Sequence, residues 1–236
     1  MISQLQSPTQ IIYPESDGKL MADNTKQFRW IVVIQQNLEW LFTNSPDVFI
    51  AGDLLWYPIE GNNRICTAPD VMVVFGRPKG DRGSYKQWEE GNIAPQVVFE
   101  VLSPSNTQTE MEKKLLFYDR HCVEEYYLYN PDANELRGWL RIEDYLDIID
   151  PIKNWVSPRL EIRFDLSGEE LQLFRPDGAR FLSYVEIAQQ AEQAEQRAEQ
   201  AEQRAEQAET QLEREQQRSQ ALAERLRAAG IDPNEL

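Results

Sequence analysis

The sequence predicts an α/β domain, a mixed sheet flanked by helices, followed by a long helical tail. In the first 187 residues, short apolar runs typical of strands alternate with amphipathic segments of helical spacing. One run, 97–102, is apolar on both sides of its single acid, which is typical of a strand buried on both faces. From residue 188 onwards, small and apolar residues recur at alternating spacings of four and three, the pattern of a coiled-coil helix.

The predicted elements begin after an extended arm, residues 1–22, which contains turn-forming proline and glycine and has little periodicity. Asp23 or Asn24 can cap the first helix. In chain order, the expected elements are a helix at 25–42, strands at 48–57, 68–76 and 97–102, a helix at 108–121, a strand at 123–129, and an antiparallel meander of strands at 136–142, 155–164 and 171–174.

The tail is predicted to be a separate helix at 188–229, with a short end at 230–236 and the α/β domain confined to 23–187. The unit Ala-Glu-Gln-Arg-Ala-Glu-Gln recurs with a seven-residue period. Because the resulting seam is mostly alanine, it buries little apolar area per layer. Two interpretations stay open: a coiled coil that forms homo-oligomers through 188–229, or a solvated single helix held by Glu/Arg pairs.

Composition narrows the functional classes. The single histidine, His121, makes a multi-histidine metal site impossible. Cys66 and Cys122 have neither disulfide nor metal-ligand spacing, which suits a reducing compartment and predicts a cytoplasmic protein. No apolar run reaches the roughly 18 residues of a membrane span, so no membrane association is expected. The formal net charge of −16 opposes general affinity for nucleic acid, so DNA binding needs a local basic patch or a partner.

Three acids interrupt or begin apolar strands: Asp53, Asp70 and Glu100. A buried carboxylate is costly unless it is paired or binds a metal. If the strands are neighbours, these acids can hold Mg²⁺, which one or two carboxylates bind together with water and substrate phosphate. The competing interpretation is structural, because acids at strand ends more often cap turns or pair with arginine. Glu39, on the first helix, is a weaker candidate because most helix glutamates are solvated.

The order of several motifs identifies a family resemblance. The motifs are Pro69-Asp70, Glu100 followed by Leu-Ser-Pro-Ser, Lys114 with Tyr118 four residues on, and Val123-Glu124-Glu125-Tyr126 before an Asn-Pro turn. Over about residues 20–185 this order resembles the Uma-two family of restriction endonucleases, in the PD-(D/E)XK nuclease superfamily. The resemblance implies a restriction-endonuclease-like fold and leaves out the helical tail.

Carried over to this sequence, the resemblance implies that Asp70 and Glu100 bind the metal, Mg²⁺ or Mn²⁺, and that Lys114 stabilises the transition state. One departure is Leu102, since superfamily members usually have lysine two positions after the glutamate. In this family the lysine is expected on the following helix, where Lys113 would point about 100° away from Lys114. Asp53 matches no motif and is at most a supporting acid, and Tyr118 is expected to be core packing.

The function predicted from these observations is a Mg²⁺-dependent endonuclease that hydrolyses DNA phosphodiester bonds. The loop at 77–86, which carries Arg77, Lys79, Arg82 and Lys86, is expected to contact DNA phosphate. The alternative is a catalytically inactive nuclease fold that serves as a scaffold or interaction protein and assembles through its helical tail.

Overall fold

A computed structural model describes residues 11–18 and 22–228 of the 236-residue chain. Most of the predicted arm (1–10 and 19–21) and the predicted end (230–236) therefore lie outside the described residues. The chain divides into two compact units, one ending at Ser183 and one beginning at Tyr184. The second unit consists of the helix α3 (Tyr184–Ala228), which begins before the predicted start at 188.

The first unit is built on a mixed six-stranded sheet, which confirms the predicted fold class. Its strand order is β1-β3-β5-β6-β7-β8. The central pair β5–β6 is parallel, and every other neighbouring pair in this sheet is antiparallel. The strands are β1 (Val48–Gly52), β3 (Val71–Phe75), β5 (Val97–Val101), β6 (Glu125–Asn130), β7 (Glu135–Ile142) and β8 (Tyr145–Ile148).

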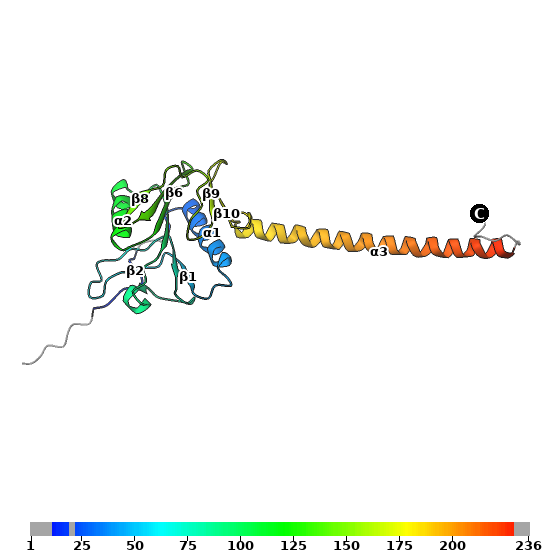
Figure 1. Ribbon diagram of the computed structural model, residues 1–236, viewed down its shortest axis with the longest axis horizontal. Helices are drawn as coiled ribbons and strands as arrows, with labels where there is room; N and C mark the ends of the chain where they lie inside the picture. The colour runs from blue at the N-terminus through cyan, green and yellow to red at the C-terminus, as the bar shows by residue number, and fades with distance from the viewer. Residues whose placement is uncertain (1–10, 19–21, 229–236) are drawn as a thin grey trace, which may run out of the picture. The chain divides into compact units, whose positions relative to one another are not determined.

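Two helices cover opposite faces of this sheet (Figure 1). On one face, α1 (Thr25–Leu41) packs Ile31, Ile34 and Leu38 against odd-numbered residues of β3 and β5. On the other, α2 (Gln108–Arg120) packs Tyr118 against even-numbered residues of the same strands. The alternation follows from the two-residue period of a strand. Because β5 is buried on both faces, a side chain on its even-numbered face points towards α2.

The start of α2 is fixed by a capping box. The Thr107 hydroxyl accepts a hydrogen bond from the Glu110 backbone N–H at 3.2 Å. In return, the Glu110 carboxylate accepts one from the Thr107 N–H at 2.9 Å. The two residues satisfy backbone donors that an isolated helix end leaves unpaired. Only a short turn separates this cap from the end of β5, so the cap determines which α2 side chains reach the strand.

The strand predicted at 48–57 is wrong as a single element. It breaks after β1 at Asp53, whose φ of 49° lies in the left-handed region. The Asp53 N–H donates instead to the carbonyl oxygens of Pro69 and Asp70, at 3.1 and 3.3 Å. The chain resumes as β2 (Trp56–Tyr57), which pairs in parallel with β4 (Tyr85–Lys86). The predicted loop 77–96 thus contains a short strand and a 3-10 turn, η1 (Gln87–Glu90).

The strand predicted at 155–164 is also wrong, and β8 was not expected. The segment turns back on itself, so that Val156 forms an isolated antiparallel bridge with Arg163. The strand found there, β9 (Arg163–Asp165), pairs with β10 (Gln172–Phe174) in a separate two-stranded sheet. The segment before β9 turns where it supplies hydrogen-bond donors to the fully buried Glu125. The Ser157 hydroxyl and the Arg159 N–H, the latter at 2.7 Å, both donate to that carboxylate.

Candidate active site

The pairing of β3 with β5 aligns two acidic residues predicted from sequence. Val71 lies opposite Phe99, so the same antiparallel register, extended by one residue, sets Asp70 opposite Glu100. Asp70 Oδ2 accepts a hydrogen bond from the Val101 N–H at 2.6 Å. Both side chains are buried, with relative exposures of 8% for Asp70 and 3% for Glu100. The two acids therefore share one end of the β3–β5 strand pair.

Helix α2 supplies the partners of Glu100. Lys114 Nζ donates to Glu100 Oε2 at 2.7 Å, and the Tyr118 hydroxyl donates to Oε1. Residues four apart lie one above the other on a helix face, so both side chains reach the same carboxylate. Lys114 Nζ also lies 3.4 Å from the carbonyl oxygen of Ala68, just before Asp70. Lys113 is exposed. The structure thus brings Asp70, Glu100 and Lys114 into one cluster.

Two further residues join this cluster: Tyr118, which was expected to be core packing, and Asp53, which was expected to be at most a supporting acid. Tyr118 is fully buried against Trp56 and Tyr126, as expected of core packing, but its hydroxyl holds Glu100. The spacing of Lys114 and Tyr118 was the signal available for this contact. Asp53 enters through the left-handed turn after β1, which no sequence pattern marked.

The cluster contains more acidic groups than basic ones, and the pKa shifts of its members reflect this excess. Burial, and then the neighbouring Glu100, raise the pKa of Asp70 well above its usual value, although Lys114 and the Val101 N–H oppose them. Burial also raises the pKa of Asp53, to which Asp17 and Glu100 add. Burial lowers the pKa of Lys114, but the surrounding carboxylates, Glu100 first, outweigh it, so the net shift is upward. One ammonium group thus faces three carboxylates.

The donor set suits a hard divalent cation. Across residues 11–18 and 22–228, no three His, Cys, Asp or Glu side chains are grouped as metal ligands. One or two carboxylates are nevertheless enough to bind Mg²⁺ when waters and phosphate complete its coordination shell. The buried Tyr126 hydroxyl has no hydrogen-bond partner among the described residues. Burial, then Glu100 and Asp70, raise its pKa well above the usual value. An unsatisfied polar group beside two acids fits a site that takes a hydrated ion.

The end of β5 is tied to α1 by polar contacts that sequence reasoning missed. Gln27, buried on α1, donates from Nε2 to the carbonyl oxygen of Val101 at 2.9 Å. Beyond the strand, the Ser103 and Ser105 hydroxyls both donate to Asp23, the first at 2.6 Å. These two bonds lower the pKa of Asp23. The two serines therefore stabilise the turn after Glu100.

The basic loop is not the free patch that the sequence suggested. Each of its four basic residues pairs with a carboxylate. Arg77 and Arg82 both bind Glu90, at 2.8 and 2.7 Å. Lys79 binds Glu39 at 2.7 Å, which gives Glu39 a structural partner, and Lys86 lies 3.4 Å from Glu89. These pairs hold the loop in shape and reduce the positive charge it offers to a phosphate.

We expect Arg82→Ala to lower the free energy of unfolding by about 2 kcal/mol, because it leaves the Glu90 charge with one partner fewer. The Arg82 side chain is only 13% exposed and also donates to the carbonyl oxygens of Pro78 and Gly80. Its guanidinium lies 3.9 Å from the centroid of the Phe49 ring. Urea denaturation measures the loss. Lys86→Ala is the control, and it should lower the free energy of unfolding by no more than about 0.5 kcal/mol. An equal loss for both variants would contradict the stabilising role of Arg82.

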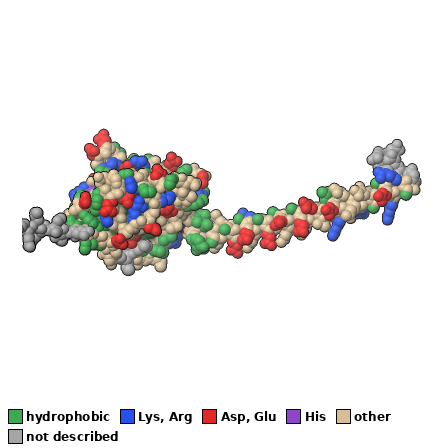
Figure 2. All heavy atoms as spheres, turned by 90° about the horizontal axis from the view of Figure 1, so that it is seen from below, with side chains coloured by type: hydrophobic (Ala, Val, Ile, Leu, Met, Phe, Trp, Pro, Cys, Tyr) green, Lys and Arg blue, Asp and Glu red, His purple; other side chains and the backbone are tan. Residues whose placement is uncertain are grey.

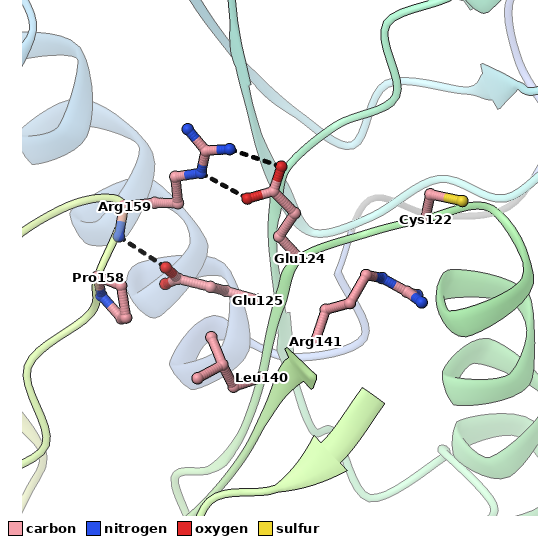
Figure 3. A pocket seen from close by; sticks show the side chains of 7 residues that line it. All are labelled: Cys122, Glu124, Glu125, Leu140, Arg141, Pro158 and Arg159. Carbon is pink, nitrogen blue, oxygen red and sulfur yellow. Dashed lines mark hydrogen bonds and ion pairs between the residues drawn. The ribbon is translucent and has the colours of Figure 1, made fainter. Parts of the chain in front are cut away.

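A polar hollow of about 600 Å³ lies at the start of β6, away from the Asp70–Glu100 cluster (Figure 3). Glu125 pairs with Val97, the first residue of β5, whereas Glu100 is near the last. Figure 3 shows Glu124 joined to Arg159 by two bonds, of 2.5 and 2.6 Å. Glu125 is satisfied by internal donors. Because these charged groups already have partners within the protein, they have a structural role. We therefore do not consider this hollow a candidate active site.

The described helices include none that is long and apolar enough to cross a membrane. The fold and the cluster define an α/β protein with buried acids and a lysine gathered at one end of a mixed sheet. The chain belongs to the Uma2 family, described as "Putative restriction endonuclease", whose sequence profile matches residues 4–212. This confirms the resemblance and extends it beyond the expected range of 20–185, into both the arm and the tail.

Among the solved structures that resemble the chain is one of low similarity. It is a crystal structure of "a putative nuclease belonging to DUF820" from Anabaena variabilis, with 17% identity and a TM-score of 0.43. The match covers 57% of this chain and 72% of that one. Among curated proteins, none is significantly similar to the chain.

Proposed function

We propose that the chain is a Mg²⁺- or Mn²⁺-dependent endonuclease that hydrolyses DNA phosphodiester bonds. The observation that carries the proposal is the buried pair Asp70–Glu100 with Lys114 bonded to Glu100 at 2.7 Å. Membership of a family described as restriction endonucleases supports the reaction class. A structural ion pair would need one acid and one base, whereas this cluster buries more acid than it neutralises.

In this proposal Asp70 and Glu100 are the protein ligands of the cation. When bound, a divalent ion lowers the pKa of a coordinated water and offsets charge on the phosphate. Glu100 is oriented by Tyr118 and Asp70 by the Val101 N–H, so both carboxylates are held in place before the ion arrives. Because the pKa of Asp70 is raised, this carboxyl must lose its proton to become an anionic ligand. Activity is therefore expected to rise with pH.

Lys114 has the second role. In hydrolysis, a water oxygen bonds to phosphorus while the bond from phosphorus to one sugar oxygen breaks, and negative charge builds on the phosphate oxygens. The ammonium group of Lys114 stays protonated, because its pKa is raised above the usual value by the carboxylates around it. If this ammonium group moves from Glu100 to a phosphate oxygen, it neutralises the charge that builds there.

The proposed DNA contact is the 77–86 loop, through its lysines. Arg77 and Arg82 share Glu90, whereas Lys79 and Lys86 each pair with a separate carboxylate and have partly exposed side chains. Because the basic residues of the loop are paired and the chain has a net charge of −16, we expect weak DNA binding in the absence of a partner. The salt dependence of that binding should be small, since few phosphates would be neutralised. Self-association through residues 188–229 belongs to the same proposal, because two copies provide two cleavage sites.

The test is Asp70→Asn, which we expect to lower cleavage about a thousandfold and to raise the thermal midpoint of the metal-free protein at neutral pH. The folded pKa of Asp70 is raised, so the folded state binds more protons and its stability falls as pH rises above the unfolded value of 3.8. The amide oxygen of asparagine can still accept the Val101 N–H. Thermal melts between acidic and neutral pH should show the difference growing with pH.

Divalent ions provide the control. Mg²⁺ at 100 times its dissociation constant should stabilise the wild-type fold by about 2.7 kcal/mol, and Asp70→Asn should show little of this gain. A wild-type protein that neither gains stability from Mg²⁺ or Mn²⁺ nor cuts DNA would contradict the proposal and favour the inactive scaffold instead. A variant less stable than wild type at neutral pH would contradict the assigned electrostatics.

A further inference from the structure

Helix α3 carries a seam of small and apolar residues, interrupted at Glu215 and Ser219, that faces solvent. Large apolar side chains on the seam are exposed, with relative exposures of 82% for Tyr184, 49% for Ile187, and 59% each for Leu212 and Leu222. Figure 2 shows acidic and apolar side chains recurring along this helix. In heptad register, with Tyr184 at position a, the a and d positions are Tyr184, Ile187, Ala191, Ala194, Ala198, Ala201, Ala205, Ala208, Leu212, Glu215, Ser219 and Leu222.

The charges on α3 do not support a helix that is stable alone. A solvated single helix would place an acid three or four residues from each arginine. Arg197 and Arg204 have none, since these positions hold only alanine and glutamine: Gln193, Ala194, Gln200, Ala201, Gln207 and Ala208. The acids instead repel one another, because Glu195–Glu199 and Glu202–Glu206 are like-charge pairs four residues apart.

The same charges are complementary between two parallel copies. Arg197 and Arg204 occupy g positions, while Glu202 and Glu209 occupy e positions, five residues further along. In a parallel, in-register pair, each g residue faces the e residue of the next heptad on the other helix. Arg197 then faces Glu202 of the second copy, and Arg204 faces Glu209. In an antiparallel pair, arginine would face arginine and glutamate would face glutamate, which disfavours that orientation.

We propose that α3 binds α3 of a second copy as a parallel, in-register, two-stranded coiled coil. The alanine layers let the helices approach closely but bury little area, so Ile187, Leu212 and Leu222 supply much of the apolar contact. The g–e pairs determine orientation and register. Because the strands are parallel, the two Ser183–Tyr184 junctions lie within an interhelical distance of about 10 Å. The dimer does not depend on nuclease activity; only the pairing of two cleavage sites rests on the proposed function.

Disulfide trapping tests the register. In the full chain carrying Cys66→Ser and Cys122→Ser, Ala201→Cys places one thiol at a d position, facing itself in the second copy. Mild oxidation should convert most of the protein to a covalent dimer. The matched control is Gln203→Cys, at the outward f position, which should remain uncrosslinked. A dimeric protein in which Ala201→Cys fails to crosslink would overturn the parallel register, and a wild-type monomer would overturn the dimer.

Charge reversal tests the g–e pairs. The variant Glu202→Arg with Glu209→Arg sets arginine against arginine across a parallel dimer, and its dissociation constant should rise at least about tenfold. The control Glu192→Arg with Glu199→Arg makes the same charge change at b positions, where the dimer should be unaffected. Both variants create favourable pairs within one helix, so helix content should not fall. Adding Arg197→Glu and Arg204→Glu to the first variant should restore the dimer.

Sedimentation velocity measures association in each case. Equal weakening by the e-position and b-position variants, or no rescue by the fourfold variant, would contradict the pairing. These measurements need neither metal nor DNA. A chain that dimerises as described but fails to cut DNA would therefore leave this inference intact and overturn only the proposed function.

Discussion

Glu100→Gln is expected to lower metal-dependent DNA cleavage about a thousandfold or more while the protein stays folded. Glutamine has nearly the shape of glutamate: its single amide oxygen can accept the hydrogen bond from Lys114, and its amide N–H can donate to the oxygen of the Tyr118 hydroxyl. It cannot supply the anionic oxygen that the proposed cation site needs. The substitution removes one buried charge from a cluster with an excess of acid, so the cost in stability should be small.

The chain offers a closely matched control, Glu125→Gln. Glu125 is also a buried strand glutamate bonded by a tyrosine, since the Tyr127 hydroxyl donates to it at 2.8 Å. It lies in β6, at the opposite end of the sheet from Asp70. Cleavage rates at saturating Mg²⁺, together with thermal midpoints, compare the two variants. If both variants lose activity equally, the loss comes from replacing a buried glutamate in general. That result would contradict a specific role of Glu100 beside Asp70.

Lys114→Ala is expected to reduce cleavage by about a hundredfold to a thousandfold without weakening Mg²⁺ binding. The ammonium group competes with any cation for Glu100 Oε2, which it contacts at 2.7 Å. Removing it should leave Mg²⁺ affinity unchanged or tighter, while charge on the phosphate during the reaction goes unopposed. Calorimetric Mg²⁺ titration and single-turnover cleavage separate the two effects.

Lys113→Ala is the control for this second prediction. The neighbouring lysine is exposed and has the same helix propensity, so its loss should change neither cleavage nor metal affinity appreciably. A Lys114→Ala variant that cleaves at the wild-type rate would remove lysine from the proposed mechanism. One that loses Mg²⁺ binding and cleavage together would indicate that Lys114 mainly holds Glu100 in position.

The central part of the fold could be predicted from sequence because its signals are local. The run 97–102 is apolar on both sides of Glu100, and only a strand covered on both faces explains that pattern. The start of helix α2 is also a local signal, because it is formed by the capping residues Thr107 and Glu110. A carboxylate in such a strand needs partners, and the family motif pointed to Asp70 and Lys114, which the fold brings beside it.

The remainder depended on contacts between distant segments. Asp53 joins the cluster only because the chain adopts a left-handed turn there and bonds to Pro69 and Asp70, which no local pattern specifies. The basic loop was misjudged because Glu90 lies outside the segment that looked basic, yet neutralises two of its arginines. The strand predicted at 155–164 failed because Ser157 is used to satisfy Glu125 from another strand.

The capping box at Thr107 has a consequence for how such a chain can change over time. When the acid and the lysine share one strand, their separation is fixed by the strand itself, and the turn after it is free to vary. Here Glu100 is on β5 and Lys114 on α2, so the five residues 102–106 set the rotation of one relative to the other. Inserting a residue into α2 before Lys114 would turn that side chain away by about 100°, and losing the cap would leave the start of the helix unfixed. Leu102, at the position where superfamily members usually have the lysine, packs against the core. Selection on the site would therefore act on the length of the turn between β5 and α2.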